Sequence, residues 1–195
     1  MKRILLFISF IAFTAFTSTY FDFKESLEIV VKEDSEVSIS GTSNINSFNC
    51  CYNISKLESP VPVYFEFREK NMYFQSTVLE LESDCFDCGH NAINKDFNKL
   101  LKTQVYPKIK LKLLAIERNS EQNNTFNAKV EIYIADVVNC FVFPVKVSKE
   151  EDMRFIGDIS LDLRDYKLEA PKKMMGLITV NPNVNVNFNL HLKEI

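Results

Sequence analysis

The sequence predicts a mainly β protein, folded as an antiparallel barrel of about eight strands with one short helix. Three observations support this fold class. Apolar and polar residues alternate along most of the 195-residue chain, which is the pattern of strands with one face in water. The alternating segments follow one another at hairpin-like spacing, without the βαβ pattern of a parallel sheet. One segment, residues 85–109, has helical spacing instead.

The first strands are expected at residues 27–31 and 36–41, joined by a polar turn, and a third is expected to begin near residue 48. Successive side chains on a strand point to opposite faces, so the third strand separates Cys50 from Cys51. Residues 61–68 alternate over eight positions. A turn at Lys70 and Asn71 then leads into a strand over 73–81, where the alternation is less clean.

The segment from residue 85 to residue 109 contains the predicted helix. Ile93, Phe97, Leu100 and Leu101 recur at helical spacing, and the pair Tyr106-Pro107 closes the segment. We expect Phe97 and Leu101 to cover one end of the barrel. The Tyr-Pro pair then turns the chain back into the barrel wall.

Five more strands follow, at residues 108–113, 128–134, 141–147, 159–163 and 184–192. In the first, Ile109 and its alternate neighbours face inward while three lysines face water. Residues 165–175, which contain Pro171 and several charges, are a long excursion. The last strand has five apolar side chains on one face and only polar ones on the other. An apolar face of this length favours a barrel wall over the alternative, a two-sheet sandwich.

The N-terminus has the pattern of an export signal. Lys2 and Arg3 precede an apolar run over residues 4–16 and small residues at 17–19. We therefore expect a signal peptide at 1–19 and a single domain at 20–195, in the periplasm or secreted. An uncleaved anchor is the alternative, but the run is shorter than the roughly 20 apolar residues of a membrane span. No later segment is a candidate for an integral membrane span.

Charge and composition exclude several partner classes. Removing Lys2 and Arg3 from the 23 basic residues leaves 21 against 26 acidic ones, a net charge of −5. The remaining basic residues are scattered, so nucleic acid is not expected as a partner. Four glycines are too few for a glycine-rich phosphate loop. Nothing in the composition indicates a bound nucleotide.

Five cysteines in an exported chain favour disulfides. We expect a bridge from Cys50 to Cys88, which closes a loop of about 38 residues and stabilises the fold by about 4 kcal/mol in the chain-entropy model. Two alternatives stay open. The Cys85-Phe-Asp-Cys88 spacing also fits a redox pair at a helix N-terminus, though it lacks the βαβ context. A zinc site is the other, with ligands drawn from Cys50, Cys51, Cys85, Cys88 and His90.

No catalytic motif is found. The two histidines, His90 and His191, do not belong to a recognised nucleophilic or metalloprotease motif, and neither GxSxG nor HExxH occurs. The sequence therefore predicts a protein that is not an enzyme, with no cofactor and no metal.

The order of several short motifs resembles the YceI-like family of exported, lipocalin-like barrels. These motifs cover nearly the whole mature chain, and they are Gly41-Thr-Ser-Asn, Phe48-x-Cys50, Phe86-Asp-Cys88-Gly89, Asn94-Lys95-Asp96-Phe97, Tyr106-Pro107-Lys108-Ile109, Phe143-Pro144-Val145, Leu161-x-Leu163-x-Asp165-Tyr166 and the region from Pro171 to Ile178. The resemblance implies an extended barrel around an elongated apolar ligand of the isoprenoid or fatty-acid kind, with no catalytic residues.

The inward positions of the predicted strands, together with two helical residues, form the candidate ligand site. They are Phe65, Phe67, Phe97, Leu101, Ile109, Leu111, Val130, Ile132, Phe141, Phe143, Val186, Phe188 and Leu190. Such a lining offers only apolar contact and selects length and shape. The alternative is that these side chains meet at the barrel axis as an ordinary core. The protein is then a structural or interaction module of the cell envelope that binds no ligand.

Overall fold

The computed structural model describes residues 25–119, 124–149 and 151–195. The predicted signal peptide, residues 1–19, lies outside the described residues and stays a prediction.

The described chain is mainly antiparallel β-sheet with one α-helix, α1 (Asn91–Leu100). Short 3-10 turns follow several strands, among them η2 (Ser83–Cys85), η3 (Leu163–Tyr166) and η4 (Met174–Gly176). The strands are β1 (Glu25–Val31), β2 (Glu36–Ser43), β3 (Ser47–Tyr52), β4 (Val61–Arg68), β5 (Asn71–Gln75), β6 (Val78–Glu82), β7 (Phe86–Asp87), β8 (Lys108–Arg118), β9 (Thr125–Ile134), β10 (Val137–Lys149), β11 (Met153–Asp162), β12 (Lys172–Lys173) and β13 (Ile178–Glu194).

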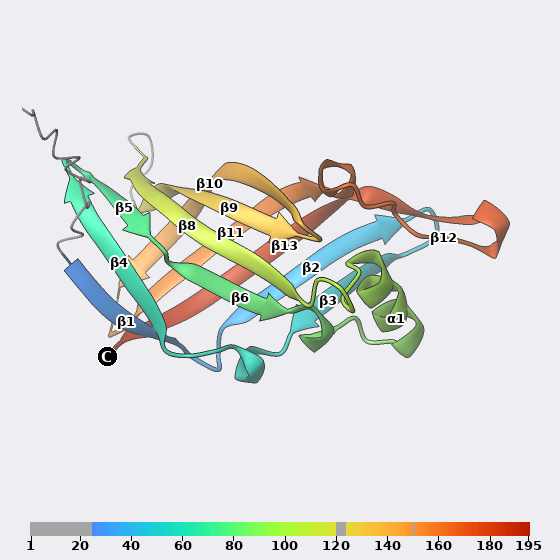
Figure 1. The fold of residues 1–195 in the computed structure, drawn as a ribbon, viewed down its shortest axis with the longest axis horizontal. Coiled ribbons are helices and arrows are strands. Elements are labelled where there is room, and N and C mark those ends of the chain that lie inside the picture. Colours follow the sequence, from blue (N-terminus) through green and yellow to red (C-terminus); the bar gives the residue numbers. More distant parts are fainter. Residues whose placement is uncertain (1–24, 120–123, 150) are drawn as a thin grey trace, which may run out of the picture.

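Eight strands close into a ring in the order β1-β4-β5-β8-β9-β10-β11-β13, and β13 pairs again with β1. The predicted lipocalin-like barrel is therefore confirmed. Figure 1 shows it as an elongated body, with β12 and the neighbouring turns projecting beyond one end and α1 lying below them. We call this end the mouth.

The 17-residue strand β13 joins the two edges of the barrel. One of its edges pairs with β11 over its whole inner length, from Asn183 to Leu192. Its other edge pairs first with β2, where Val186 lies opposite Ile39, and then with β1, where Leu192 lies opposite Val31. The long alternating C-terminal segment is thus a barrel wall, as predicted, because only a continuous strand can span both partners.

The predicted strand over residues 73–81 is in fact two strands, β5 and β6. Ser76 has a φ of 55°, in the left-handed region that a β-strand does not use, and it interrupts the strand. The partner strand β8 has a register shift at the same level, between Leu113 and Ala115. This break lets β8 pair with β5 near its far end and with β6 near the mouth.

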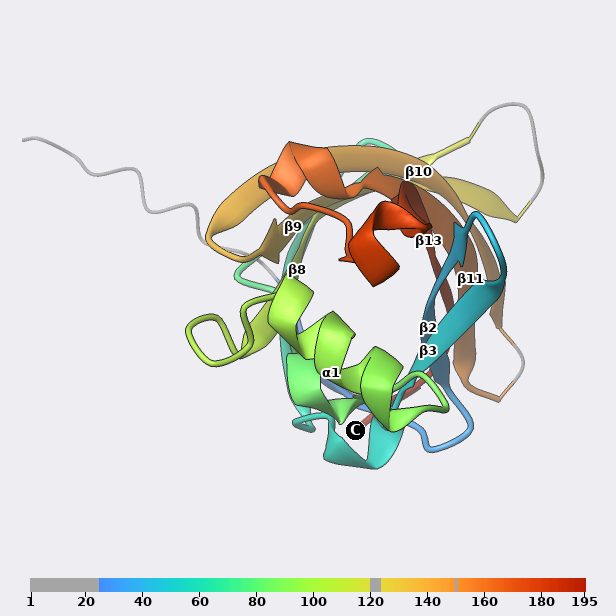
Figure 2. The same ribbon diagram turned by 90° about the vertical axis from the view of Figure 1, so that its right-hand side faces the viewer.

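The helix α1 begins and ends where its capping contacts predict. The His90 side chain accepts a hydrogen bond from the Ala92 backbone N–H at 3.1 Å, and so satisfies a free donor of the first turn. The Asn94 side chain accepts a hydrogen bond from the Cys88 N–H at 2.7 Å. At the other end, Lys102 has a φ of 55° and ends the helix. Figure 2, a view along the barrel, shows α1 beside the open end of the ring.

Candidate functional site: an apolar cavity inside the barrel

The barrel encloses a cavity of about 460 Å³. Every strand of the ring contributes side chains to its lining, and α1 contributes at the mouth. Among the described lining residues, hydroxyl or carboxylate groups occur only on Thr77, Asp96 and Tyr166. This volume lies within the range of small-molecule sites, and the interior is almost purely apolar.

The interior is hollow, which side-chain exposure shows independently. Val186, Phe188 and Leu190 project into the barrel from β13, yet all three are only partly buried. By contrast, Ile132 and Leu161, nearer the mouth, are almost completely buried. Inward side chains that keep accessible surface have no partners across the axis. The filled-core alternative therefore does not hold in the middle of the barrel.

A glycine on β11 creates room inside the barrel. Gly157 lies opposite Phe188, and a Cβ atom at position 157 would come within 2.6 Å of the Phe188 ring. The Phe188 ring instead lies close to the wall and contacts the Phe143 ring, with centroids 5.9 Å apart. The large aromatic side chains thus line the lumen without crossing it.

The α1 segment and η3 border the mouth. Phe97 and Leu101 of the α1 segment are buried and line the cavity. Tyr166 of η3 is 1% exposed, and its hydroxyl donates to the Ile132 carbonyl at 3.4 Å. Burial raises the pKa of the Tyr166 hydroxyl well above its ordinary value. Asp96 lies at the rim, where its carboxylate accepts a hydrogen bond from Lys173.

Eleven of the thirteen residues of the candidate site line the cavity, and their part in ligand binding stays a prediction. They are Phe65, Phe97, Leu101, Ile109, Leu111, Val130, Ile132, Phe143, Val186, Phe188 and Leu190.

Phe67 and Phe141 are not among the residues that line the cavity, although Phe141 lies opposite the lining residue Val130. Phe67 lies near the end of β4 and is 59% exposed, with its ring stacked edge-on against Phe65. Phe141 packs against the buried core cluster. Periodicity of 2 gives the face of a strand but not the level at which the cavity ends, which accounts for Phe67 near the end of β4.

Several lining residues were not predicted, notably on β1, β2, β3 and β5. Leu27, Ile29 and Ile39 belong to segments whose alternation is visible in the sequence, so the same rule could have found them. Met72 and Phe74 are harder to predict, because β5 and β6 were read as one strand.

The predicted disulfide between Cys50 and Cys88 is present and connects β3 to the start of the α1 segment. The Cys85-x-x-Cys88 motif therefore does not form its own bridge, and Cys51, Cys85 and Cys140 are free thiols. Burial, and then the nearby Asp84 carboxylate, raise the pKa of the Cys85 thiol. This shift is opposite to the one that activates a redox cysteine. Across the described ranges, no three His, Cys, Asp or Glu side chains gather into a metal site.

A cluster of polar and charged residues lies on the outer face of the barrel, near the end opposite the mouth. His191 on β13 lies with its Nδ1 2.8 Å from the Asp34 carboxylate, which also forms an ion pair with Arg154. Lys32 forms an ion pair with Asp152 at 3.0 Å. The hydrogen bond from His191 lowers the pKa of Asp34, and the one from Lys32 lowers the pKa of Asp152. These contacts join the β1–β2 turn to β11 and β13.

No helix among the described residues is both long enough and apolar enough to cross a membrane.

Comparison with known proteins identifies the fold. No protein-family model matches the chain, and no curated protein matches its sequence. The structure is similar to that of BcnA from Burkholderia cenocepacia, with a TM-score of 0.65 and 15% identity over 84% of this chain and 99% of that one. It is also similar to a polyisoprenoid-binding domain from Saccharophagus degradans implicated in plant cell wall breakdown, with a TM-score of 0.60 and 10% identity over 87% and 99%.

A third similar structure is the YceI protein of Campylobacter jejuni, with a TM-score of 0.52 and 13% identity over 68% of this chain and 80% of that one. The chain therefore has a YceI-like fold, as its motifs indicate.

Proposed function

We propose that this protein is an exported carrier that holds an elongated apolar molecule, isoprenoid-like or fatty-acid-like, inside its barrel without converting it chemically. The observation that carries the proposal is the hollow lumen of about 460 Å³ with an apolar wall. An unfilled apolar space of this size lowers the stability of a barrel, because the lining side chains lack packing partners. A bound apolar ligand would supply those partners.

The wall selects a ligand by length and shape. The Tyr166 hydroxyl already donates to the Ile132 carbonyl, so its proton is not available to a ligand head group. Each buried CH₂ contributes about 0.8 kcal/mol, so a long chain can bind firmly through apolar contact alone. Any polar end of the ligand is best placed at the mouth, near Asp96 and Lys173.

Two further observations support the ligand class and the location. One structural neighbour is a polyisoprenoid-binding domain, which is the class of molecule that an elongated apolar lumen suits. The Cys50–Cys88 disulfide fits an oxidising compartment, and with the predicted signal peptide it favours the periplasm or secretion.

Native mass spectrometry and organic extraction of the protein purified from its own host test the proposal. We expect a long-chain compound at near one-to-one stoichiometry. Val186→Trp, which fills the lumen, should remove the compound or shorten its chain. Val142→Trp, on the 61% exposed outer face of β10, is the matched control and should leave it unchanged.

Two results would overturn the proposal. One is an empty extract from the unmodified protein. The other is a compound that the Val186→Trp variant retains in full. Co-purification of a stoichiometric protein partner together with an empty extract would instead support the interaction module.

A further inference from the structure

The excursion between β11 and β13 presents large apolar side chains to solvent at the mouth. Met174 and Leu177 are 68% and 72% exposed, and Met175 is completely exposed. Ile45, in the turn between β2 and β3, is 63% exposed. We call these four residues the apolar tip. Figure 1 shows that the excursion projects beyond the barrel end, next to the β2–β3 turn.

Hydrogen bonds hold the two parts of the apolar tip together. The Asn44 side chain donates to the Leu177 carbonyl at 2.8 Å and accepts from the Thr179 N–H at 2.9 Å. The Asn44 N–H in turn donates to the Thr179 carbonyl at 3.1 Å. Ile45 is therefore fixed beside Leu177, and the apolar tip is one surface built from two loops.

The backbone of the excursion is arranged to display these side chains. Met174, Met175 and Gly176 have successive φ values of 50°, 57° and 92°, all in the left-handed region. This region costs roughly 1–2 kcal/mol for a residue with a side chain. Below the turn, β12 pairs with the start of β13, where Lys173 lies opposite Ile178. Two methionines are thus held outward in an unfavourable conformation, where they shield nothing within the described chain.

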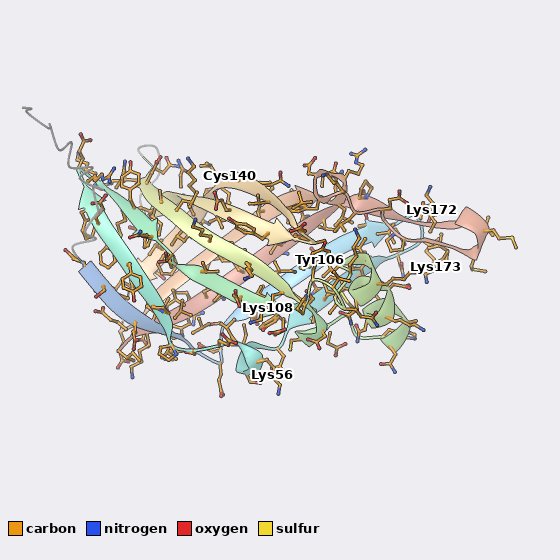
Figure 3. All side chains as sticks on the ribbon, in the orientation of Figure 1. Lys56, Tyr106, Lys108, Cys140, Lys172 and Lys173 are labelled. Carbon is orange, nitrogen blue, oxygen red and sulfur yellow. A yellow bond between two sulfur atoms is a disulfide. The ribbon has the colours of Figure 1, made fainter. Side chains whose placement is uncertain are left out.

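Exposed lysines lie at the base of the apolar tip and on the neighbouring α1 segment. Lys172 and Lys173 lie at its base, as Figure 3 shows, and α1 with its following turn adds exposed lysines at positions 95, 99 and 102. Asp96, which pairs with Lys173, and Glu169 are the acidic residues of these two segments. The two segments, residues 91–106 and 168–179, therefore carry five positive and two negative charges, whereas the whole chain has a net charge of −3. Around them, Arg164 pairs with Asp162, Lys167 lies two residues from Asp165, and Asp87 lies near the start of α1.

A projecting apolar loop flanked by lysines fits a lipid bilayer better than a protein partner. A stable protein interface buries at least about 1,000 Å², and four side chains on a narrow loop offer far less. Membrane binding needs only a few apolar side chains at the acyl boundary together with attraction between basic residues and anionic head groups. Methionine suits the first task because its flexible side chain adapts to a disordered surface.

We propose that the apolar tip and its lysines dock the mouth of the barrel against an anionic lipid bilayer, where an apolar ligand can pass between membrane and lumen. The claim that the protein docks to a membrane depends only on the apolar tip and the lysines. The claim that a ligand passes between membrane and lumen also depends on the proposed function. The position supports both, because Lys173 next to the apolar tip is bonded to Asp96 at the rim of the cavity.

Flotation of the purified protein with vesicles tests the proposal. We expect binding to phosphatidylcholine vesicles that contain phosphatidylglycerol, weaker binding to phosphatidylcholine alone, and loss of binding as salt is raised. The variant Met174→Ser/Met175→Ser/Leu177→Ser should weaken partitioning by about tenfold or more, because apolar insertion and charge act together. The matched control, Val138→Ser/Val142→Ser/Ile156→Ser, removes three exposed apolar residues from the outer wall and should bind like the unmodified protein.

Lys172→Glu offers a second variant with the apolar tip intact, and it should reduce binding only to anionic vesicles. The proposal is overturned if the unmodified protein does not float with anionic vesicles, or if the apolar-tip and wall variants behave alike.

A concentration-dependent dimer that the apolar-tip variant abolishes, seen by sedimentation velocity, would assign the surface to a second copy instead. A protein that carries a long-chain compound yet ignores vesicles defeats this inference alone, whereas vesicle binding with an empty extract defeats the carrier function alone.

Discussion

Lys173 Nζ lies 2.6 Å from Asp96 Oδ1, although 77 residues separate the two in the chain. The contact joins the excursion that carries the apolar tip to α1, and Asp96 lines the cavity. Both side chains are partly exposed. An ion pair in this position adds little to the stability of the fold, but it holds together two elements that border the mouth.

Lys173→Ala should therefore speed the release of a bound lipid with little effect on stability. We expect a fluorescent fatty-acid analogue to dissociate severalfold faster, while the free energy of unfolding changes by about 1 kcal/mol or less. Lys110→Ala is the matched control, because Lys110 forms an ion pair of similar length and exposure with Glu80 on the barrel wall. Equal dissociation rates in the two variants would mean that the contact does not restrain the mouth.

Breaking the Cys50–Cys88 disulfide should destabilise the protein strongly. The bridge closes a loop of 38 residues, and the chain-entropy model gives about 4 kcal/mol for such a loop. Denaturant unfolding of Cys50→Ser/Cys88→Ser against the unmodified protein measures the loss. Cys51→Ser and Cys140→Ser, at exposed free thiols, should each change stability by less than about 0.5 kcal/mol. A double variant as stable as these controls would contradict the role of the bridge.

The sequence was most informative where one face of a strand is buried and the other is wet. The alternation along β8 and β13 fixed both the strands and their inward faces. It even gave the solvent face of β8, where Lys108 and Lys110 now form ion pairs with Glu80. Together, the hydrogen bonds to Glu80 and Glu82 raise the pKa of Lys108. These ion pairs depend on the register between neighbouring strands, which cannot be predicted from the alternation within one strand.

The sequence could not predict whether the barrel is hollow. The residues on the inward face of a strand look alike whether their side chains meet at the axis or leave a lumen. Gly157 decides part of the outcome by giving the Phe188 ring room at the wall, and this depends on the register between β11 and β13. The apolar tip escaped prediction for a similar reason, since the exposure of Met175 depends on a left-handed turn without a periodic signal.

The hairpin between β9 and β10 should be easy to stabilise. Its two turn residues, Ala135 and Asp136, have φ values of 48° and 68°, which suit a type I′ turn with Asn and Gly. Ala135→Asn/Asp136→Gly should raise the free energy of unfolding by about 1 kcal/mol, because both residues tolerate the left-handed region. Thermal unfolding measures the gain. Ala92→Gly, at an exposed position in α1, is the control and should lower the free energy of unfolding by about 0.5–1 kcal/mol. A loss of stability in both variants would contradict the turn assignment.

Acid should weaken the contacts by which the Asp34–His191 cluster joins the β1–β2 turn to β11 and β13. The pKa values of Asp34 and Asp152 are lowered in the folded protein by their hydrogen bonds to His191 and Lys32. A lowered carboxyl pKa contributes stability above the ordinary value, near 3.9, and that contribution is lost as pH falls through the lowered folded value.

The double variant Asp34→Asn/Asp152→Asn should therefore lose less stability than the unmodified protein as pH falls below about 5. Urea unfolding at a series of pH values measures this difference. Asp158→Asn removes a carboxylate from β11 without touching the cluster and serves as the charge control. Parallel pH profiles for the double variant and the unmodified protein would show that the two carboxyl groups are not linked to folding.

Phe97 should matter both for stability and for ligand retention. Its ring lies on the buried face of α1, 5.4 Å from the Phe86 ring, and it also borders the cavity. Removing a buried aromatic ring costs about 3–5 kcal/mol in a solid core, and we expect the lower end of that range because one side of Phe97 already faces open space. Without the ring, the lumen opens further at the mouth, so a bound lipid should dissociate faster from Phe97→Ala.

Val105→Ala is the control for Phe97→Ala, since Val105 lies in the same segment but is exposed. It should leave both thermal stability and lipid dissociation close to those of the unmodified protein. The two readouts separate the two roles of the ring. Lower stability with unchanged dissociation makes Phe97 a core residue only, whereas faster dissociation at nearly unchanged stability makes it chiefly a cover. If neither quantity changes, the α1 segment does not close the barrel.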